Sequence, residues 1–586
     1  MQPAPDGIDH PVTPAGRVAN GERPSNWVPI HEEPAFTPRK LRIICVGAGF
    51  SGLTLAHKIK YELQLEDVVD YILYDKNDEI GGTWTENRYP GVACDIPAHA
   101  YTFLFEPNPD WSHFYAPGAE IRAYIQNTAR KWKLDDHVEL NSRVLESVWD
   151  EESGKWKLKI EQNGTIKADE AEIFVNATGF SNHWTWPQIE GLSNFKGKLV
   201  HSAGWDESYE WKGKRVAVIG NGSSGIQCVA NMHSQASRLV NYVRNPTWVA
   251  DNISSQMTKD GGNFAYTEEE RAQFKNDPKK FFEFRKELED AVNGFAFAML
   301  ADHPFNQLTE DGARKLMETR LKDSLDPSIL ETMIPDFIPG CRRLSPGDGY
   351  LEAFSNPTVR MCRAPIQSIT ETGIKTADDD EEFDLIVCAT GFNTSFLPRW
   401  KLVGRNGCTL DERWKNHPEA FFSIHANGMP NYFMIAGPNF TVSNGNLLAG
   451  VSFVCDHIIR WTRRIATEDI KSVDVKKDSV DDYNVWAQEY MKRTAWAGSC
   501  RSWYKSGKSS GQVTANYPGT TSHFKKALES LGENISTFGT TLPIASASLE
   551  MDRWKRRRMA WETCRLISSK GYGDLPLHDR SYRHMI

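Results

Sequence analysis

Hydrophobic residues recur along this chain in short runs that end at glycine-rich turns. One run, at 41–46, is followed by a glycine-rich turn at 47–52 and a helical pattern from Leu53, and the next run, at 68–74, ends at Asp75. Continuous apolar runs are typical of strands buried on both faces of a parallel sheet. The order of these elements predicts a strand-helix-strand unit.

The same order of elements returns later in the chain. A run at 215–219 leads into a second glycine-rich turn at 220–225, a helical pattern from Ile226 and a run at 239–243 that ends at Arg244. Two such units predict an α/β fold with two Rossmann-like dinucleotide-binding domains.

Two further apolar runs, 173–176 and 385–388, both lead into Ala-Thr-Gly-Phe. This repeat indicates that the chain leaves the first domain, builds the second and then returns. The predicted organisation is an extended or disordered leader at 1–38, a discontinuous first domain at 39–180 plus 385–540, a second domain at 181–384 and a C-terminal tail at 541–586. A charged, helix-prone stretch at about 265–335 is interpreted as a helical insertion in the second domain, able to form a lid over the substrate.

The composition fits a globular protein. The chain has 586 residues, of which 40% are hydrophobic and 25% charged, and a formal net charge of −9. The negative charge argues against nucleic acid as a partner. No apolar run approaches the roughly 20 residues needed to cross a bilayer, so we expect no membrane span and a cytoplasmic location. The ten cysteines are scattered singly, without a CxxC pair or metal-ligand spacing, which predicts no disulfide framework, no redox dithiol and no metal site.

The first glycine-rich turn has the spacing of a dinucleotide fingerprint. Gly47 permits a tight turn, Gly49 lets the backbone approach a pyrophosphate, and Gly52 allows close packing of helix and strand, with Ser51 between them. The N-terminus of the following helix would stabilise the phosphate charge. Asp75 stands where a carboxylate accepts ribose hydroxyls. A purely structural turn is the alternative interpretation.

The second turn consists of Gly220, Asn221, Gly222, Ser223, Ser224 and Gly225. Here Arg244 replaces the carboxylate at the end of the second strand. A guanidinium at that place would pair with a 2′-phosphate, which favours NADPH over NADH as the ligand. A surface arginine at a strand end is the alternative.

A glycine-rich, aromatic segment follows the first strand-helix-strand unit. It contains Gly82, Thr83 and Trp84, and its glycines would let the backbone lie against a flat ring system. Trp84, Tyr89 and Tyr101 could form the wall of an apolar pocket.

Two longer motifs carry a resemblance to a known family. The segment from Gly82 to Asp95 reads GxWxxxxYPGxxxD, and Phe195 to Asp206 reads FxGxxxHxxxWD. Both resemble the Baeyer-Villiger monooxygenases, and the resemblance extends from about residue 40 to about residue 530. It includes Gly340-Cys341-Arg342-Arg343, residues 430–438 and Ser502-Trp503-Tyr504.

The resemblance implies a reaction and its cofactors. FAD would occupy the first domain and NADPH the second; NADPH would reduce the flavin, which would add dioxygen at its C4a carbon, and the peroxyflavin anion would attack a ketone to give an ester or lactone. Such chemistry needs a cation that stabilises negative oxygen. By resemblance that cation is Arg343, oriented by Asp95; a surface ion pair is the alternative.

The resemblance also places residues around the nicotinamide cofactor. Arg342 would approach its phosphate, Asn245 follows Arg244 in the same site, and Trp503 would belong to a loop that folds over the cofactor. A tryptophan of the core is the alternative for Trp503. The fingerprint residues Phe195, Gly197, His201, Trp205 and Asp206 are interpreted as a linker that fixes how the two domains meet, with Gly197 permitting a bend and His201 structural rather than a general base.

Other functions remain open at this level. An N- or S-oxygenating flavin-containing monooxygenase would carry tyrosine at the place of Trp205 and would need no arginine at 343. A pyridine nucleotide disulfide reductase would need a cysteine pair, and a non-catalytic nucleotide-binding protein would not need Arg343. The ketone is not specified by any spacing, although the resemblance implies bulky cyclic or steroid ketones, on which some long members of the family act. The oligomeric state is likewise not specified.

Overall fold

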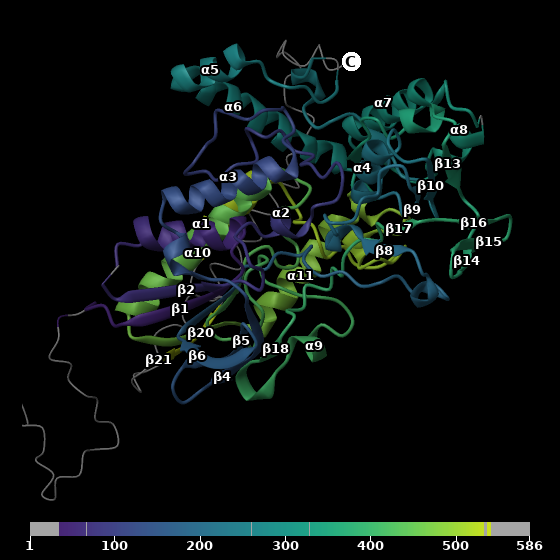
Figure 1. The fold of residues 1–586 in the computed structure, drawn as a ribbon. Helices are drawn as coiled ribbons and strands as arrows, with labels where there is room; N and C mark the ends of the chain where they lie inside the picture. The colour runs from purple at the N-terminus through teal and green to yellow at the C-terminus, as the bar shows by residue number, and fades with distance from the viewer. Residues whose placement is uncertain are drawn as a thin grey trace, which may run out of the picture.

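The computed structural model describes residues 34, 36–65, 67–259, 261–326, 328–531 and 536–540. Most of the predicted leader and all of the predicted tail at 541–586 lie outside these residues. The described chain forms two α/β domains with helices between and above them (Figure 1). The predicted fold class is thereby confirmed.

The first domain is built on a five-stranded sheet in the order β19-β7-β1-β2-β3. Its strands are β1 (Leu41–Val46), β2 (Val69–Tyr74), β3 (Val138–Glu139), β7 (Ile173–Asn176) and β19 (Tyr432–Met434). All neighbours pair in parallel. Alternate residues of β1 point to opposite sides of the sheet, and both sides are buried.

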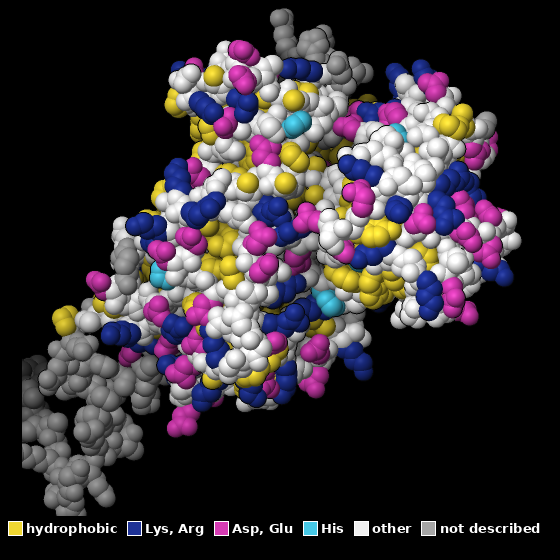
Figure 2. Space-filling model, viewed as in Figure 1, with side chains coloured by type: hydrophobic (Ala, Val, Ile, Leu, Met, Phe, Trp, Pro, Cys, Tyr) yellow, Lys and Arg dark blue, Asp and Glu magenta, His cyan; other side chains and the backbone are white. Residues whose placement is uncertain are grey.

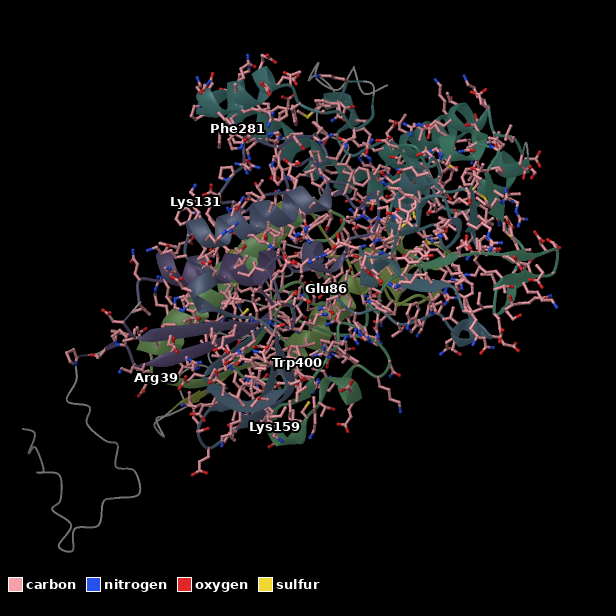
Figure 3. All side chains as sticks on the ribbon, viewed as in Figure 1. Arg39, Glu86, Lys131, Lys159, Phe281 and Trp400 are labelled. Atoms are coloured by element: carbon pink, nitrogen blue, oxygen red, sulfur yellow. A yellow bond between two sulfur atoms is a disulfide. The ribbon has the colours of Figure 1, made fainter. Side chains whose placement is uncertain are left out.

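Each face of this sheet has its own core. On one face, Ile43 and Cys45 pack against α1 (Phe50–Tyr61), α3 (Gly118–Lys131) and α10 (Leu447–Thr467). On the other face lies a four-stranded sheet in the order β18-β4-β5-β6, formed by β18 (Lys401–Val403), β4 (Ser142–Asp150), β5 (Lys155–Gln162) and β6 (Thr165–Ala171). Trp400, labelled in Figure 3, lies between the two sheets and donates its indole N–H to Ser147 Oγ at 3.0 Å.

The second domain is built on a parallel sheet in the order β13-β10-β9-β17-β8. Its strands are β8 (Lys198–His201), β9 (Arg215–Ile219), β10 (Arg238–Tyr242), β13 (Val359–Cys362) and β17 (Leu385–Cys388), and α4 (Ser223–Met232) follows β9. The expected boundary at 385 is wrong, because β17 pairs with β8 and β9 in the second sheet. An apolar run alone does not specify the sheet that a strand joins, so the chain returns to the first domain only after β17.

The stretch at 265–335 is helical. It contains α5 (Glu268–Asn276), α6 (Pro278–Gly294), α7 (Pro304–Leu321) and α8 (Ser328–Met333). Met317 of α7 belongs to the core of the second domain, whereas Leu288 of α6 packs with Phe114 of the first. The insertion therefore contacts both domains, and its role as a lid stays a prediction.

The remaining elements are short or peripheral: α2 (Thr83–Glu86), β11 (Val249–Ala250), β12 (Ser345–Pro346), β14 (Ile366–Ile369), β15 (Gly373–Thr376), β16 (Asp380–Glu382), α9 (Leu410–Arg413), β20 (Ile470–Val475), α11 (Lys477–Met491), α12 (Thr521–Ser530) and β21 (Ser536–Thr540). In the part of the chain that the structure describes, no helix combines the length and apolarity that a membrane crossing requires. On the visible face, basic and acidic side chains are interspersed (Figure 2).

One prediction about the cysteines is wrong. Cys341 and Cys500, which are 159 residues apart, form a disulfide, and both are buried. Such a long separation leaves no spacing signal in the sequence. Across the described ranges, no cluster of His, Cys, Asp and Glu is suited to hold a metal ion.

Candidate functional site

The first glycine-rich turn joins β1 to α1 and cannot carry larger residues. Gly47 has φ +111°, and a Cβ there would lie 2.6 Å from the Ala177 carbonyl oxygen. A Cβ on Gly52 would lie 2.0 Å from the Gly47 carbonyl oxygen. The helix begins at Phe50, three residues before the expected start, so it opens inside the turn itself.

Asp75 ties the end of β2 to this turn. Its side chain is buried, and Oδ2 accepts a 2.7 Å hydrogen bond from the Ala48 backbone N–H while Oδ1 accepts one of 2.9 Å from Asn77. Burial raises the pKa of the carboxyl, and these two bonds oppose the rise. Ribose binding by Asp75 stays a prediction, for which the carboxylate keeps unused lone pairs.

The second glycine-rich turn is built like the first, except that one of its glycines, Gly222, has free space beside it. Gly220 has φ +118°, and a Cβ on Gly225 would lie 2.3 Å from the Gly220 carbonyl oxygen. Gly222 differs, because a Cβ there would meet no atom within 4 Å. Asn221 donates to the Asn245 carbonyl at 2.9 Å, and the hydroxyls of Ser223 and Ser345 lie 2.8 Å apart. Ser224 contacts the Tyr89 hydroxyl.

Both turns fit a dinucleotide pyrophosphate. The helices α1 and α4 are capped by Gly49 and Gly222, without a capping side chain and without a carboxylate in the first turn. Their first backbone N–H groups therefore point at space that an anion can use. Helix α5 differs, because the side chains of Thr267 and Glu270 accept hydrogen bonds from backbone N–H groups at its N-terminus. The open place at Gly222 leaves room for a close approach.

The motif from Gly82 to Asp95 begins against the first turn. Gly82, with φ +57°, would place a Cβ 2.9 Å from Gly49 Cα, so the two backbones touch. Thr83 and Trp84 open the short helix α2, which lies near the centre of the molecule, where Figure 3 labels Glu86. Trp84 packs edge-on against Tyr101, and Tyr101 packs in the same way against Phe50 of α1.

The middle of this motif docks onto the second domain. Tyr89 is part of that domain's core and donates its hydroxyl to Gln227 at 2.8 Å. Gly91, with φ +82°, packs so closely on Asn231 that a Cβ would lie 2.0 Å from its side-chain nitrogen. Gln227 and Asn231 both belong to α4. The motif therefore connects the two glycine-rich turns.

Asp95 and Arg343 form a two-pronged ion pair. Arg343 Nε donates to Oδ2 at 2.8 Å and an Nη donates to Oδ1 at 2.7 Å. The Arg343 side chain keeps 27% of its surface exposed. Burial lowers the pKa of the guanidinium, but the Asp95 carboxylate and the Tyr504 hydroxyl raise it, and the net pKa lies above its ordinary value. The structure thus brings together the two residues for which catalysis was predicted, and their catalytic roles stay predictions.

Tyr504 joins this pair and was missed by the sequence interpretation. It is buried, its hydroxyl lies 2.8 Å from Ser443 Oγ, and it interacts with the Arg343 guanidinium. Burial raises the pKa of the phenol, so the hydroxyl keeps its proton and can donate. The only sequence signal for Tyr504 was its place beside Trp503.

Trp503 contacts the end of the first Ala-Thr-Gly-Phe segment and a residue just after the second. Its indole stacks on Phe180 with ring centres 5.6 Å apart and an interplanar angle of 11°. Its carbonyl accepts a 3.5 Å hydrogen bond from Thr394. The loop that carries Trp503 and Tyr504 is therefore in contact with residues that follow β7 and β17.

Three of the residues predicted for the nicotinamide cofactor lie beside the second turn, namely Arg244, Asn245 and Arg342. Arg342 donates to the Pro246 carbonyl at 2.9 Å, and Arg244 and Asn245 are exposed just before that proline. Burial and the charge of Arg501 lower the pKa of Arg244, and burial and the charge of Arg244 lower that of Arg342. The site is electrostatically prepared for an anion.

The motif from Phe195 to Asp206 consists of a strand followed by a turn. Lys198–His201 forms β8 of the second sheet, so the expectation of a linker is wrong for this part. The chain bends at Gly197, as expected, and a larger residue would not fit there, because a Cβ would lie 2.5 Å from the Phe195 ring and 2.9 Å from the Asp384 carbonyl oxygen. Trp205 packs against the second core, and Asp206 pairs with Lys198.

His201 is fully buried, and its structural role stays a prediction. Its Nδ1 accepts a 3.1 Å hydrogen bond from the Ala203 backbone N–H, and its ring stacks on Trp184 with centres 4.4 Å apart and an interplanar angle of 4°. Burial lowers its pKa to about 4. A base that is fully buried and engaged in this way is not placed to act on a substrate.

Comparisons with known proteins agree with this geometry. Residues 40–264 match the family described as flavin-binding monooxygenase-like. The chain is 50% identical over 511 residues to the FAD-binding monooxygenase tazF of Aspergillus terreus, which covers 86% of this chain and 90% of that protein. It is 32% identical over 492 residues to a Baeyer-Villiger monooxygenase of Streptomyces coelicolor, which covers 83% and 90%.

Solved structures share the fold. The closed crystal structure of cyclohexanone monooxygenase matches with a TM-score of 0.75 at 22% identity, covering 86% of this chain and 100% of that one. A steroid monooxygenase bound to NADP matches with a TM-score of 0.73 at 24% identity, covering 85% and 99%. From the identity and coverage of the curated relatives, the chain belongs to the Baeyer-Villiger monooxygenases of the flavin-binding monooxygenase-like family.

Proposed function

We propose that this chain uses FAD, NADPH and dioxygen to convert ketones, with a preference for bulky cyclic or steroid ketones, into esters or lactones. The observation that carries the proposal is the Asp95–Arg343 pair, which places a permanent cation beside the buried hydroxyl of Tyr504. When bound, FAD would take a hydride from NADPH and, once reduced, would activate dioxygen, the source of the inserted oxygen atom. The first turn, with Gly47, Gly49, Ser51 and Gly52, would hold FAD, and the second turn would hold NADPH.

Arg343 contributes fixed positive charge. Asp95 uses Nε and one terminal nitrogen, which leaves the outer edge of the guanidinium to donate hydrogen bonds to negative oxygen. Because the charge is held in place before the reaction, little reorganisation is needed when negative charge develops on the ketone oxygen. Asp95 is a positioning residue in this proposal.

The loop with Trp503 and Tyr504 keeps water away from the reacting atoms. Tyr504 is buried between Ser443 and Arg343, and the Trp503 indole lies flat on Phe180. Exclusion of water strengthens the interaction of the guanidinium with negative oxygen and suppresses wasteful side reactions.

Product analysis tests the proposal. The purified FAD-loaded protein is incubated with NADPH and a panel of cyclic, aryl and steroidal ketones, and in parallel with a thioether, and the products are identified by mass spectrometry. Ester or lactone from a ketone supports the proposal. Formation of sulfoxide without any ester would instead favour an N- or S-oxygenating flavin-containing monooxygenase.

A further inference from the structure

The disulfide joins two segments that each carry an arginine next to the half-cystine. Cys341 directly precedes Arg342, and Cys500 directly precedes Arg501, so the bond between the two sulfurs brings these arginines to flanking positions. The Cys500 backbone N–H also donates to Cys341 Sγ at 3.2 Å, which fixes the two segments side by side. Arg501 had no role in the sequence interpretation.

A third arginine completes the group. Arg342 donates to the carbonyl of Pro246, which lies two residues after Arg244. Among the described residues, none of the ion pairs involves Arg244, Arg342 or Arg501. The charge of Arg501 acts on Arg244, and that of Arg244 acts on Arg342, each lowering the pKa of its neighbour. Neighbouring guanidiniums without a carboxylate repel each other, and those of their donors that are not bound to Pro246 can serve an anion.

The position of the three arginines in the fold indicates which anion they would bind. Arg244 follows β10, the second strand of the strand-helix-strand unit, where the adenosine ribose of a bound dinucleotide lies. The pyrophosphate would lie at Gly222 and the start of α4, on the other side of the turn. A phosphate attached to the ribose is therefore the group within reach of all three arginines.

We propose that Arg501, together with Arg244 and Arg342, binds the 2′-phosphate of NADPH, and that the Cys341–Cys500 disulfide holds Arg501 in place for this. The proposal rests on the proposed function in so far as NADPH is the cofactor. It makes Arg501 a residue that discriminates NADPH from NADH. A dianionic phosphate can accept paired hydrogen bonds from several guanidiniums at once, which NADH cannot offer.

The proposed contact between Arg501 and the 2′-phosphate would also connect the cofactor to the Arg343 site. Arg501 lies in the loop at 498–509, which also carries Trp503 and Tyr504. Within this loop Lys505 is buried and donates to the carbonyls of Gly498 and Ser509, so the loop is held together as one unit. Binding of the 2′-phosphate by Arg501 therefore stabilises the position from which Tyr504 contacts Arg343.

Binding of two nucleotides tests the role of Arg501 without turnover. Titration calorimetry of the FAD-loaded protein measures the Kd of 2′,5′-ADP and of 5′-ADP, which lacks the 2′-phosphate. Arg501→Ala is expected to raise the Kd of 2′,5′-ADP about tenfold, or ~1.4 kcal/mol, and to leave that of 5′-ADP unchanged. Arg501 is exposed, so the variant should fold. Lys508→Ala, which removes an exposed charge from the same loop, is the matched control and should change neither Kd.

The disulfide has its own experiment. A dithiol reductant cleaves the bond to two thiols and is itself oxidised to its disulfide. Reduction is expected to raise the Kd of 2′,5′-ADP several-fold in the wild type but to add nothing in Arg501→Ala, and Cys500→Ser should resemble the reduced wild type. An equal effect of Arg501→Ala on both nucleotides, or no effect on either, would overturn the proposal. An enzyme that binds 2′,5′-ADP as expected but forms no ester would instead overturn the proposed function.

Discussion

Asp95 and Arg343 are 248 residues apart in the chain, yet two parallel hydrogen bonds of 2.8 and 2.7 Å join them. The carboxylate therefore fixes both the charge and the orientation of the guanidinium. Both partners lie two residues after an anchored position: Ala93 accepts a hydrogen bond from Gln227 of α4, and Cys341 is disulfide-bonded.

Removal of the guanidinium should stop oxygen transfer but not flavin binding. Arg343→Ala is expected to lower ester formation by roughly 10²–10³-fold or more, because a preorganised donor to negative oxygen is lost. The flavin absorbance of the purified variant should remain. Arg360→Ala, which removes an arginine paired with Asp379 and Glu381 at the surface, is the control and should retain activity. Undiminished ester formation by Arg343→Ala would contradict the role.

The hydroxyl of Tyr504 should matter for coupling. Tyr504→Phe removes the contacts with Ser443 and Arg343 while keeping the ring, and we expect a roughly 5–10-fold lower yield of ester per NADPH, equivalent to one hydrogen bond of ~1–1.5 kcal/mol. The measurement compares NADPH consumed, ester formed and hydrogen peroxide released. Tyr350→Phe is the matched control, because its hydroxyl donates to Asn241 inside the second core. Tyr350→Phe should lower the stability of the protein and leave the amount of ester formed per NADPH unchanged. A wild-type amount of ester per NADPH in Tyr504→Phe would argue against the role of the Tyr504 hydroxyl.

Two neighbouring glycines should respond differently to the same substitution. Gly225→Ala forces a Cβ against the Gly220 carbonyl and should destabilise the second domain by several kcal/mol. Gly222→Ala meets no protein atom and should leave the melting temperature unchanged, but it fills the space through which a pyrophosphate approaches and should weaken NADP⁺ binding. Gly312→Ala in α7, also without a neighbour, is the control and should stabilise slightly. Equal binding by Gly222→Ala would reject a dinucleotide at this turn.

Burial of His201 gives the unfolding free energy a pH dependence. Its pKa of about 4 in the folded protein lies below the ordinary value of 6.5, so between these values the unfolded chain binds more protons. The stabilising contribution is complete above pH 6.5 and is lost as the pH falls towards 4. His201→Gln should therefore reduce the slope of unfolding free energy against pH in this window by up to ~1.4 kcal/mol per pH unit. Denaturant titrations from pH 4.5 to 7 measure this slope. An unchanged slope in His201→Gln would mean that His201 is not buried in its neutral form.

Local features of the fold could be predicted from the sequence. The strand, the glycine-rich turn and the helix follow one another within about 30 residues, so their order along the chain is also their order in space. The same holds for Gly47, Gly52, Gly220 and Gly225, whose neighbours are fixed by the turn itself.

Contacts between distant segments could not be predicted in this way. Nothing in the spacing of Cys341 and Cys500 indicates a bond, and nothing local to Tyr504 indicates its contacts with Arg343 and Ser443. The strand at 385–388 illustrates a second limit, since an apolar run ending in Ala-Thr-Gly-Phe fits either sheet equally well. It lies between β9 and β8 of the second sheet, so its place depends on two strands that come much earlier in the chain.

The place of β19 beside β7 has a consequence for how the protein is made. β7 ends at Asn176, but the strand that covers its outer edge begins only at Tyr432, after the whole second domain. At the usual rate of about 5–20 residues per second, a ribosome takes roughly 10–50 s to reach it. During that interval the nascent first domain presents an open strand edge, at which another chain can add. The discontinuity of the domain therefore concentrates the risk of aggregation in the period of synthesis, before the finished protein exists.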